Sequence, residues 1–269
     1  MKLSITIGWL YPELMSTYGD RGNIIVLTKR CEWRRINVTV LPIEFKTSEK
    51  DIESCDFIFG GGAQDRQQGI LVNDLREKKG TVLKKMFGRG TPGLFVCGAP
   101  QLLGHYYMTG DGKRLDGLGI FDMESKHFGK SKPRCIGNTI GKISEYFFKG
   151  GPSTRTSTEL SRTSSGGQQN TVVGFENHGG RTYLGRGVKP FAKVIKGCGN
   201  NGDDGTEGAV YKNCIATYSH GPFLPKNPHI ADWLIAKTLE VKYKKVIPLE
   251  PLDDTLEWQA HEAILQRFT

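Results

Sequence analysis

Strand-like and helix-like patterns alternate along the first half of the chain, and this alternation restricts the fold more than any other property of the sequence. Helical spacing of apolar residues, first seen at Ile24, Leu27 and Cys31, falls between runs of the β type. Such a chain favours an α/β fold in three layers, with a mostly parallel sheet flanked by helices. The predicted strands are 3–7, 37–43, 55–59 and 93–97. Three helices are predicted: one capped by Asn23, one at about 70–87 and one around 102–107.

Beyond Gly110 the pattern changes to short β-like pieces, which predict a β extension in the second half of the chain. Two helices are expected to close the chain, one capped by Asn227 and one beginning near Asp254. The Gly/Ser/Thr-rich segment at about 149–170 is interpreted as a flexible surface loop, so we expect 1–269 to form a single domain. The predicted pieces of the extension are 118–123, 135–143, 171–175, 181–184 and 214–219.

Composition and charge exclude several classes of protein. No run of about 18 apolar residues is present, so we expect no transmembrane segment. The net charge is +9, but the basic residues are scattered and no nucleic-acid-binding signature accompanies them, so we expect no nucleic-acid partner. The six cysteines form no C-x-x-C pair, which predicts neither a metal site nor a disulfide framework and favours a reducing cytoplasm.

Cys97 is the candidate nucleophile. It lies between the apolar run 93–97 and the next helical pattern, where unpaired N–H groups and the helix dipole stabilise a thiolate. Gly98 and Ala99 let the backbone turn sharply and let a substrate approach. For the other five cysteines we predict buried structural or plain surface roles.

A cysteine nucleophile needs a base, and two of the six histidines are candidates. His220 follows the strand predicted at 214–219, and α/β proteins place their sites at such strand ends. His178 lies in a glycine-bounded segment and is the rival, for which a structural hydrogen-bonding role is favoured.

Five motifs in order resemble class I glutamine amidotransferases of the cobyric-acid-synthase-like branch. The nucleophile segment is Val96-Cys97-Gly98-Ala99-Pro100-Gln101, and the histidine segment is Ser219-His220-Gly221-Pro222. With the stretches 10–23, 60–63 and 174–182, and with 224–228 continuing the histidine segment, the chain resembles the family of stand-alone amidotransferase subunits of lipid II isoglutaminyl synthase.

This resemblance implies an activity and a partner. The chain would hydrolyse L-glutamine and supply ammonia to a Mur-ligase-like, MurT-type subunit in a heterodimer. That partner would amidate the D-glutamate of the lipid II stem peptide in peptidoglycan synthesis. No cofactor is expected in this chain, and ATP and Mg are expected on the partner. The implied location is the cytoplasm, at the inner face of the membrane through lipid II.

The resemblance and the chemistry together assign roles to further residues. Cys97 attacks the glutamine side-chain amide, and His220 protonates the departing ammonia. Backbone N–H groups of Gly98 and of Gly61 or Gly62 are expected to bind the oxyanion. Gln101 is expected to hold the substrate, and Arg134 is a candidate for binding its α-carboxylate.

The sequence departs from the wider class I pattern at Phe95, Ala99 and Pro222. Pro222 stands where that class has a glutamate two residues after the histidine, so His220 lacks an obvious orienting carboxylate. The third group could come from the partner, and within this chain Glu176 and Asp20 are the residues to test.

Two other functions remain open. An amidotransferase acting on cobyrinic acid or another small carboxylate is the nearer one, although such proteins carry their own ATP-binding domain and this chain has no P-loop. A non-catalytic binding module of the same fold is the other, and the joint presence of Cys97 and His220 argues against it.

Overall fold

The computed structural model describes residues 2–145, 147 and 170–268, so nearly all of the predicted loop at about 149–170 lies outside the described residues. The helices are α1 Arg21–Trp33, α2 Glu49–Glu53, α3 Asp65–Asp74, α4 Gly80–Gly88, α5 Gly98–Leu103, α8 Pro228–Tyr243 and α9 Thr255–Phe268, with the short turns η1 Thr17–Gly19, η2 Leu75–Lys79 and η4 Leu224–Lys226. The strands are β1 Ser4–Leu10, β2 Asn37–Ile43, β3 Phe57–Gly60, β4 Gly93–Val96, β5 Tyr106–Met108, β6 Arg114–Asp116, β7 Met123–His127, β8 Cys135–Ile143, β9 Thr171–His178, β10 Gly180–Leu184, β11 Ala192–Lys196, β12 Thr206–Glu207, β13 Ala209–Tyr211 and β14 Cys214–Thr217.

A six-stranded sheet in the order β13-β14-β4-β3-β1-β2 forms the centre of the molecule. Every neighbouring pair in it is parallel except β13 with β14. β4 and β14 are adjacent, with Val96 opposite Thr217, so the residues that follow these two strands emerge at the same edge of the sheet.

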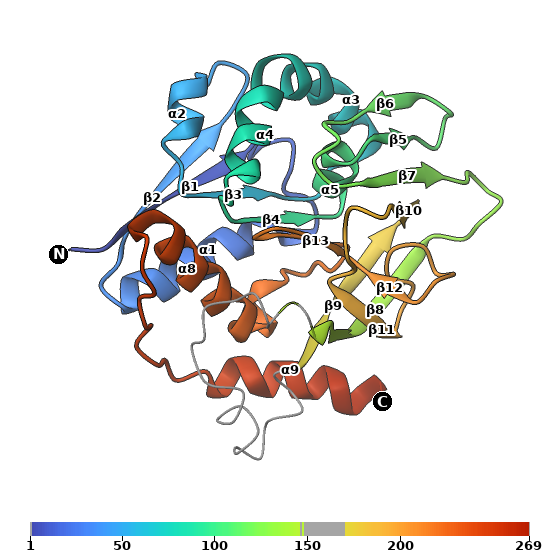
Figure 1. Ribbon diagram of the computed structural model, residues 1–269. Coiled ribbons are helices and arrows are strands. Elements are labelled where there is room, and N and C mark those ends of the chain that lie inside the picture. Colours follow the sequence, from blue (N-terminus) through green and yellow to red (C-terminus); the bar gives the residue numbers. More distant parts are fainter. Residues whose placement is uncertain (1, 146, 148–169, 269) are drawn as a thin grey trace.

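Apolar clusters on both faces of this sheet make three layers. One cluster joins it to η2 and α4 through residues such as Leu75, Leu83 and Phe87. The other joins it to α1 and α8 through residues such as Leu27 and Leu234. Figure 1 shows these two groups of helices on opposite sides of the central strands. The predicted three-layer α/β fold with a mostly parallel sheet is confirmed.

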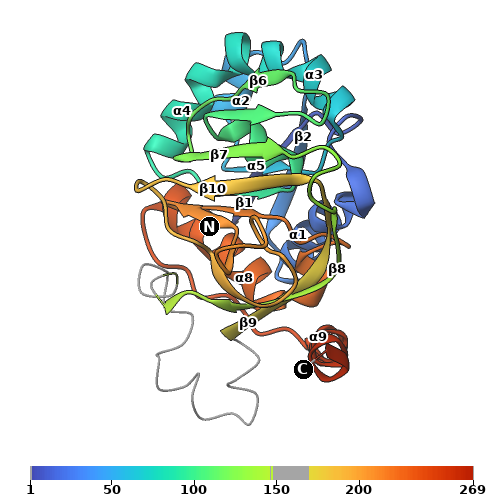
Figure 2. The same ribbon diagram turned by 90° about the vertical axis from the view of Figure 1, so that its right-hand side faces the viewer.

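The predicted β extension consists of two four-stranded sheets, ordered β10-β7-β5-β6 and β12-β11-β8-β9. Figure 2 shows the first of these stacked beside the central sheet and the strands β8 and β9 curving below it. An isolated bridge between Phe175 of β9 and His220 joins the second sheet to the edge where β14 ends. The extension therefore reaches the edge of the sheet that carries the candidate nucleophile and base.

Three local predictions were wrong. Asn23 does not cap α1, because its side chain lies within the helix and its Oδ1 accepts the Leu224 N–H at 2.8 Å. The residues 106–107 form strand β5, because α5 ends at Leu103 and Gly104 is extended. The stretch 118–122 has no strand, and pairing begins only at Met123. The structure also has elements that the sequence did not predict: α2, β6, β11, β12 and β13.

Among the described residues, no helix combines the length and the apolar character that crossing a bilayer requires.

Helix α9 packs on the body through a cluster of aromatic rings. His229 at the start of α8 stacks on Trp258 of α9 with ring centroids 5.1 Å apart. His261 of α9 donates through Nδ1 to the Lys226 carbonyl at 2.7 Å, and its Nε2 lies 2.9 Å from the Thr171 hydroxyl. Burial lowers the pKa of His229 to about 3 and also lowers the pKa of His261. Both rings are therefore neutral in the folded protein at pH 7.

Acid should weaken this packing. In the unfolded chain His229 takes up a proton near pH 6.5, but in the folded protein it does so only near pH 3, so stability falls as the pH drops below 6.5. From pH 7 to pH 5 we expect His229 to lower the free energy of unfolding by about 2 kcal/mol. Denaturant unfolding at the two pH values measures the loss. His229→Phe, which keeps an aromatic ring but cannot titrate, should reduce the pH dependence, whereas His105→Gln at an exposed histidine should not. An unchanged slope in His229→Phe would rule out this assignment.

Candidate active site

The turn that carries Cys97 has a strained backbone. Strand β4 ends at Val96, α5 begins at Gly98, and Cys97 between them has φ 53° and ψ −94°. A positive φ at a non-glycine residue costs on the order of 1–3 kcal/mol and persists only when its surroundings fix it. Here the Cys97 N–H donates to the Thr217 carbonyl of β14 at 2.8 Å. The expected position of Cys97 between a buried strand and a helix is confirmed.

His220 lies at the end of the neighbouring strand. Its main chain exchanges two hydrogen bonds with Phe175, at 2.7 and 3.2 Å, which fix the backbone just after β14. The imidazole is fully buried, and Tyr18 packs edge-on against it with ring centroids 5.1 Å apart. Nε2 of His220 has no hydrogen-bond partner among the described residues, so it is available for a reacting group.

Asp20 supplies the carboxylate that the sequence left unassigned. Its Oδ1 lies 3.1 Å from Nδ1 of His220, and both side chains are fully buried. Its Oδ2 accepts the Gly62 N–H at 2.6 Å. Asp20 is thus held by a backbone donor while it orients the imidazole, as the third member of a nucleophile–base constellation does. Sequence analysis left Asp20 and Glu176 as the two candidates within this chain, and the structure places Asp20 on His220.

Close packing brings the Asp20 turn against the histidine segment. A Cβ atom on Gly22 would lie 2.9 Å from Cβ of Pro222, the residue that stands in place of the class I glutamate. Asn23 accepts the Leu224 N–H from the same segment. Pro222, which stands in place of the class I glutamate, therefore packs on the turn that positions the Asp20 carboxylate.

The charges of this site favour an ion pair. Burial by itself lowers the pKa of His220, but the Cys97 thiolate and the Asp20 carboxylate outweigh burial and raise that pKa to about 10. At neutral pH the imidazole of His220 is therefore protonated and pairs with the Asp20 carboxylate. An adjacent cation stabilises a thiolate, the reactive form of cysteine, so this imidazolium suits Cys97 to act as a nucleophile.

The glycine loop after β3 shows that one prediction was wrong, namely that the Gly62 N–H binds the oxyanion. The Gly62 N–H is committed to Asp20, so it is not free to bind an oxyanion. Gly62 instead leaves room for the imidazole, because a Cβ there would lie 2.8 Å from Cε1 of His220. Gly61 packs tightly against the Met15 carbonyl and Asp20.

The structure places the Ala63 N–H, and not that of Gly62, next to Gly98. A Cβ atom on Gly98 would lie 2.6 Å from the Ala63 nitrogen, so the two backbones touch. The Ala63 N–H donates to no acceptor among the described residues. Gly98 is in the first turn of α5, where N–H groups have no intrahelical acceptor. Together they form a pair of donors beside Cys97, and nothing in the sequence distinguished Ala63 from its neighbours.

A pocket of about 530 Å³ opens on Cys97, which is large enough for an amino acid. Gln101, Arg134 and His178 also line it, so the structure brings the sequence-predicted substrate residues to one cavity. His220 is fully buried and is not among the residues that line the pocket.

Gln101 belongs to a buried hydrogen-bond network. Its Oε1 accepts from Gln68 at 2.8 Å, and its Nε2 donates to the Tyr218 hydroxyl at 3.1 Å. That hydroxyl lies 2.7 Å from Thr182. The network fixes the amide of Gln101 at the pocket wall with one N–H and one lone pair still unused.

Arg134 is exposed at the mouth of the pocket. Its guanidinium donates to the side-chain and main-chain oxygens of Asn177, at 3.0–3.2 Å. No carboxylate among the described residues lies within ion-pair distance of it. Its charge is therefore available to a carboxylate ligand.

His178 is held in a structural role. It stacks on Tyr218 with centroids 3.8 Å apart, and its Nδ1 lies 2.7 Å from the Gly180 carbonyl. Within the described part of the chain His178 forms no hydrogen bond or ion pair with Cys97, so the geometry favours His220 as the base. Glu176 is the other candidate for the orienting carboxylate. It accepts hydrogen bonds from the N–H groups of Cys198 and Gly199, and among the described residues it forms none with His220.

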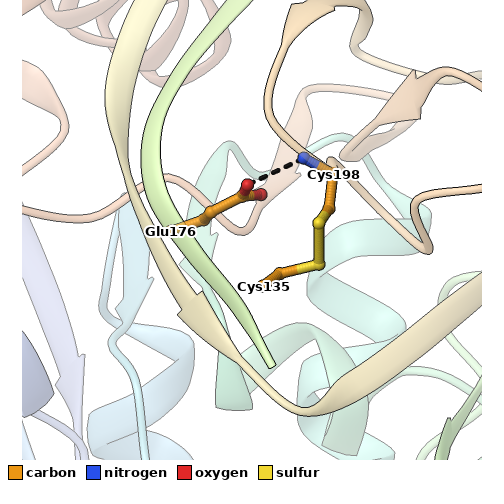
Figure 3. A group of neighbouring side chains, drawn as sticks. All are labelled: Cys135, Glu176 and Cys198. Carbon is orange, nitrogen blue, oxygen red and sulfur yellow. Dashed lines mark hydrogen bonds between the residues drawn. A yellow bond between two sulfur atoms is a disulfide. The ribbon is translucent and has the colours of Figure 1, made fainter. Parts of the chain in front are cut away.

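The sulfur atoms of Cys135 and Cys198 form a disulfide, contrary to the expectation of unpaired cysteines. No local pattern indicated this bond, because the partners are 63 residues apart and meet only when β8 packs beside β11. Figure 3 shows Glu176 beside the two sulfurs, and these three residues are the one potential metal-ligand cluster that the described part of the chain contains. The remaining cysteines are buried thiols.

Comparison with known proteins agrees with this geometry. Residues 6–228 match the CobB/CobQ-like glutamine amidotransferase domain. The chain is 38% identical to "Lipid II isoglutaminyl synthase (glutamine-hydrolyzing) subunit GatD" of Staphylococcus aureus over 98% of this chain and 96% of that protein. It is 35% identical to the protein of the same name in Streptococcus pneumoniae, over 96% and 89% of the two chains.

More distant relatives are similar in fold or over part of their length. A probable cobyric acid synthase of Methanothermobacter thermautotrophicus is 32% identical over 88% of this chain, but only 45% of that protein is covered. Among solved structures, a glutamine amidotransferase has a TM-score of 0.54 at 12% identity, covering 86% of this chain and 98% of that one. PurLQS of Thermotoga maritima has a TM-score of 0.51 at 14% identity, covering 91% and 100%.

The ion pair can be tested directly by titration. NMR of the imidazole protons should show His220 losing its proton only near pH 10. Removing either neighbouring anion, by Cys97→Ala or Asp20→Asn, should lower that pKa by about two pH units, because each anion stabilises the charged ring. Cys55→Ser, which changes another buried cysteine, serves as the control and should leave the titration unchanged. A His220 titration near pH 6.5 in the wild type would contradict the arrangement.

Proposed function

Because this chain belongs to the CobB/CobQ-like glutamine amidotransferase family, we propose that it is the glutamine-hydrolysing subunit of a lipid II isoglutaminyl synthase. The observation that carries the chemistry is the buried Cys97–His220–Asp20 constellation beside a pocket of amino-acid size. A non-catalytic module of the same fold would have no use for a strained cysteine and a buried, oriented histidine.

The first half of the reaction cleaves the amide. The Cys97 thiolate attacks the side-chain carbonyl carbon of glutamine, and the carbonyl oxygen becomes an oxyanion. The N–H groups of Gly98 and Ala63 are placed to stabilise it, and one such donor is worth about 3 kcal/mol in other enzymes. His220 gives its proton to the departing nitrogen, which leaves as ammonia and a γ-glutamyl thioester on Cys97.

The second half regenerates the enzyme. His220, now neutral, takes a proton from a water molecule that attacks the thioester carbon. The products are glutamate and free Cys97, whose thiolate re-forms the pair with the imidazolium. Asp20 stays ionised throughout and keeps Nδ1 of His220 as the donor, so that Nε2 faces the reacting atoms.

Recognition of glutamine uses two other residues of the pocket lining. The Arg134 guanidinium, which has no ion-pair partner among the described residues, can bind the α-carboxylate, and the Gln101 amide on α5 can form a hydrogen bond to the substrate. A carboxylate-binding cation and a nucleophile in one pocket suit a free amino acid.

The relatives support the acceptor and the partner. Proteins named as subunits of lipid II isoglutaminyl synthase match over 96% and 89% of their length, whereas only 45% of the probable cobyric acid synthase is covered. We therefore favour a separate Mur-ligase-like subunit in the cytoplasm that binds ATP and Mg and uses the ammonia on lipid II. Amidation of cobyrinic acid is the second candidate.

Loss of the nucleophile should abolish glutamine hydrolysis. In Cys97→Ala and Cys97→Ser we expect at least about a thousandfold loss in kcat with the fold intact, because a nucleophile and its base act as a unit. Ammonia release measures kcat, and a circular dichroism spectrum shows whether the fold is intact. Cys55→Ser should retain full turnover. Wild-type turnover in either Cys97 variant would remove the assignment.

Asp20→Asn should lower kcat about a hundredfold to ten-thousandfold in the isolated chain, because the amide cannot hold the imidazolium. Glu176→Gln is the matched control, since that carboxylate lies on Cys198 and not on His220, and it should leave kcat within a few-fold. If Asp20→Asn left kcat unchanged, Asp20 would not be the orienting group, and the same assay with the partner present would test whether the partner supplies it.

The partner and acceptor can be tested together. The native protein should co-purify with a Mur-ligase-like chain, and the complex should amidate lipid II with glutamine and ATP. A complex carrying Cys97→Ala should lose this activity with glutamine but regain it with added ammonium, because the ligase needs only ammonia. Absence of a ligase from the purified complex, or no rescue by ammonium, would favour another acceptor.

A further inference from the structure

The Cys135–Cys198 disulfide is adjacent in the chain to Arg134, the residue that we assign to the substrate carboxylate. Cys135 begins β8 one residue after Arg134, and Cys198 follows β11. Their Cα atoms are 5.9 Å apart, within the usual range for a disulfide. Figure 3 shows the bond between β8 and the 198 loop, with Glu176 of β9 beside it.

Cys198 is held in place independently of the bond. The Glu176 carboxylate accepts the N–H groups of Cys198 at 2.7 Å and Gly199 at 3.1 Å. Gly197 and Gly199 on either side have φ of 103° and 62°, which lets the backbone wrap around that carboxylate. When the bond opens, Cys198 therefore stays opposite Cys135, and the bond can re-form.

Arg181 contacts the other sulfur. Its guanidinium donates to Sγ of Cys135 and to the Pro133 carbonyl, and the side chain is buried. A cation against sulfur stabilises a thiolate, which makes Cys135 a good leaving group in thiol–disulfide exchange. The same cation opposes a divalent metal ion at this position. Two cysteines and a glutamate could bind a metal ion or take part in thiol–disulfide exchange, and the Arg181 cation favours the exchange.

The bond also affects the pocket. Arg181 and the disulfide fix the backbone on both sides of Arg134, at Pro133 and at Cys135. Cys135 is opposite His178 in the β8–β9 ladder, and Arg134 itself donates to Asn177. Opening the bond removes one of these restraints on the residue that we assign to the α-carboxylate.

We infer that Cys135 and Cys198 form a reversible disulfide that sets the affinity of the pocket for glutamine through Arg134, an inference that rests on the proposed function. Disulfides in proteins of a reducing cytoplasm are usually transient and redox-sensing. The oxidised form holds Arg134 in place and binds glutamine more tightly than the dithiol form.

The exchange step balances with a dithiol reductant. One thiolate of the reductant attacks Sγ of Cys198, which is the partly exposed partner, and the S–S bond breaks with Cys135 leaving as a thiolate beside Arg181. The second thiol of the reductant then displaces Cys198. The protein gains two electrons and two protons, and the reductant becomes a disulfide.

The experiment compares the oxidised and dithiothreitol-reduced forms of the full chain. Alkylation after acid quenching, followed by peptide mass spectrometry, counts the thiols at Cys135 and Cys198 over a range of dithiothreitol redox buffers. Glutamine hydrolysis then gives KM and kcat for each form. We expect the two cysteines to titrate together, and we expect reduction to raise KM roughly fivefold with kcat little changed, as for a weakened charge-assisted contact.

Two variants make the result specific. A chain carrying both Cys135→Ser and Cys198→Ser should have the KM of the reduced form under all conditions, whereas Cys55→Ser should respond to reductant like the wild type. Equal KM values in both forms, or two permanent thiols in the most oxidising buffer, would overturn the inference. So would stoichiometric zinc bound to the reduced protein and lost in the double variant. If no form hydrolyses glutamine, the proposed function fails and the coupling to KM with it, while the thiol count still decides whether the pair is redox-active.

Discussion

The hydrogen bond between Asp20 and His220 holds the candidate active site together, because it joins residues 200 positions apart in the chain. Neither side chain is exposed, so each charge must be satisfied by the other and by nearby donors. The Gly62 N–H supplies the second contact to Asp20. If one partner were removed, an uncompensated charge would stay buried. The turn after η1, the glycine loop after β3 and the end of β14 therefore depend on one another.

The sheet order explains how the nucleophile reaches this pair. β4 and β14 are neighbours, so Cys97 and His220 leave the same edge, and the Thr217 carbonyl holds the Cys97 N–H. The strain at Cys97 is sustained because the backbone of Gly98 packs against Ala63. The central sheet thus positions the reacting groups, as parallel α/β sheets commonly do at their carboxyl edge.

The β extension forms part of the pocket that opens on Cys97. Arg134 precedes β8, and Asn177 and His178 end β9, so one wall of the pocket comes from this added sheet. The disulfide and Glu176 lie on the same sheet, behind Arg134. Arg134 and the nucleophile therefore belong to different parts of the fold, whereas Gln101 is on α5 beside Cys97, so a change in the extension can move Arg134 without moving the nucleophile.

Local pattern determined much of this protein. Periodicity and turn residues predicted the layers of the fold, and the strand-to-helix junction identified Cys97, as the strand end did for His220, because these signals come from neighbouring residues. Asp20, Ala63 and the Cys135–Cys198 bond were decided only by the tertiary structure. A carboxylate, a small residue and two separated cysteines look ordinary in sequence. Their roles depend on packing between segments far apart in the chain, and no local pattern contains that information.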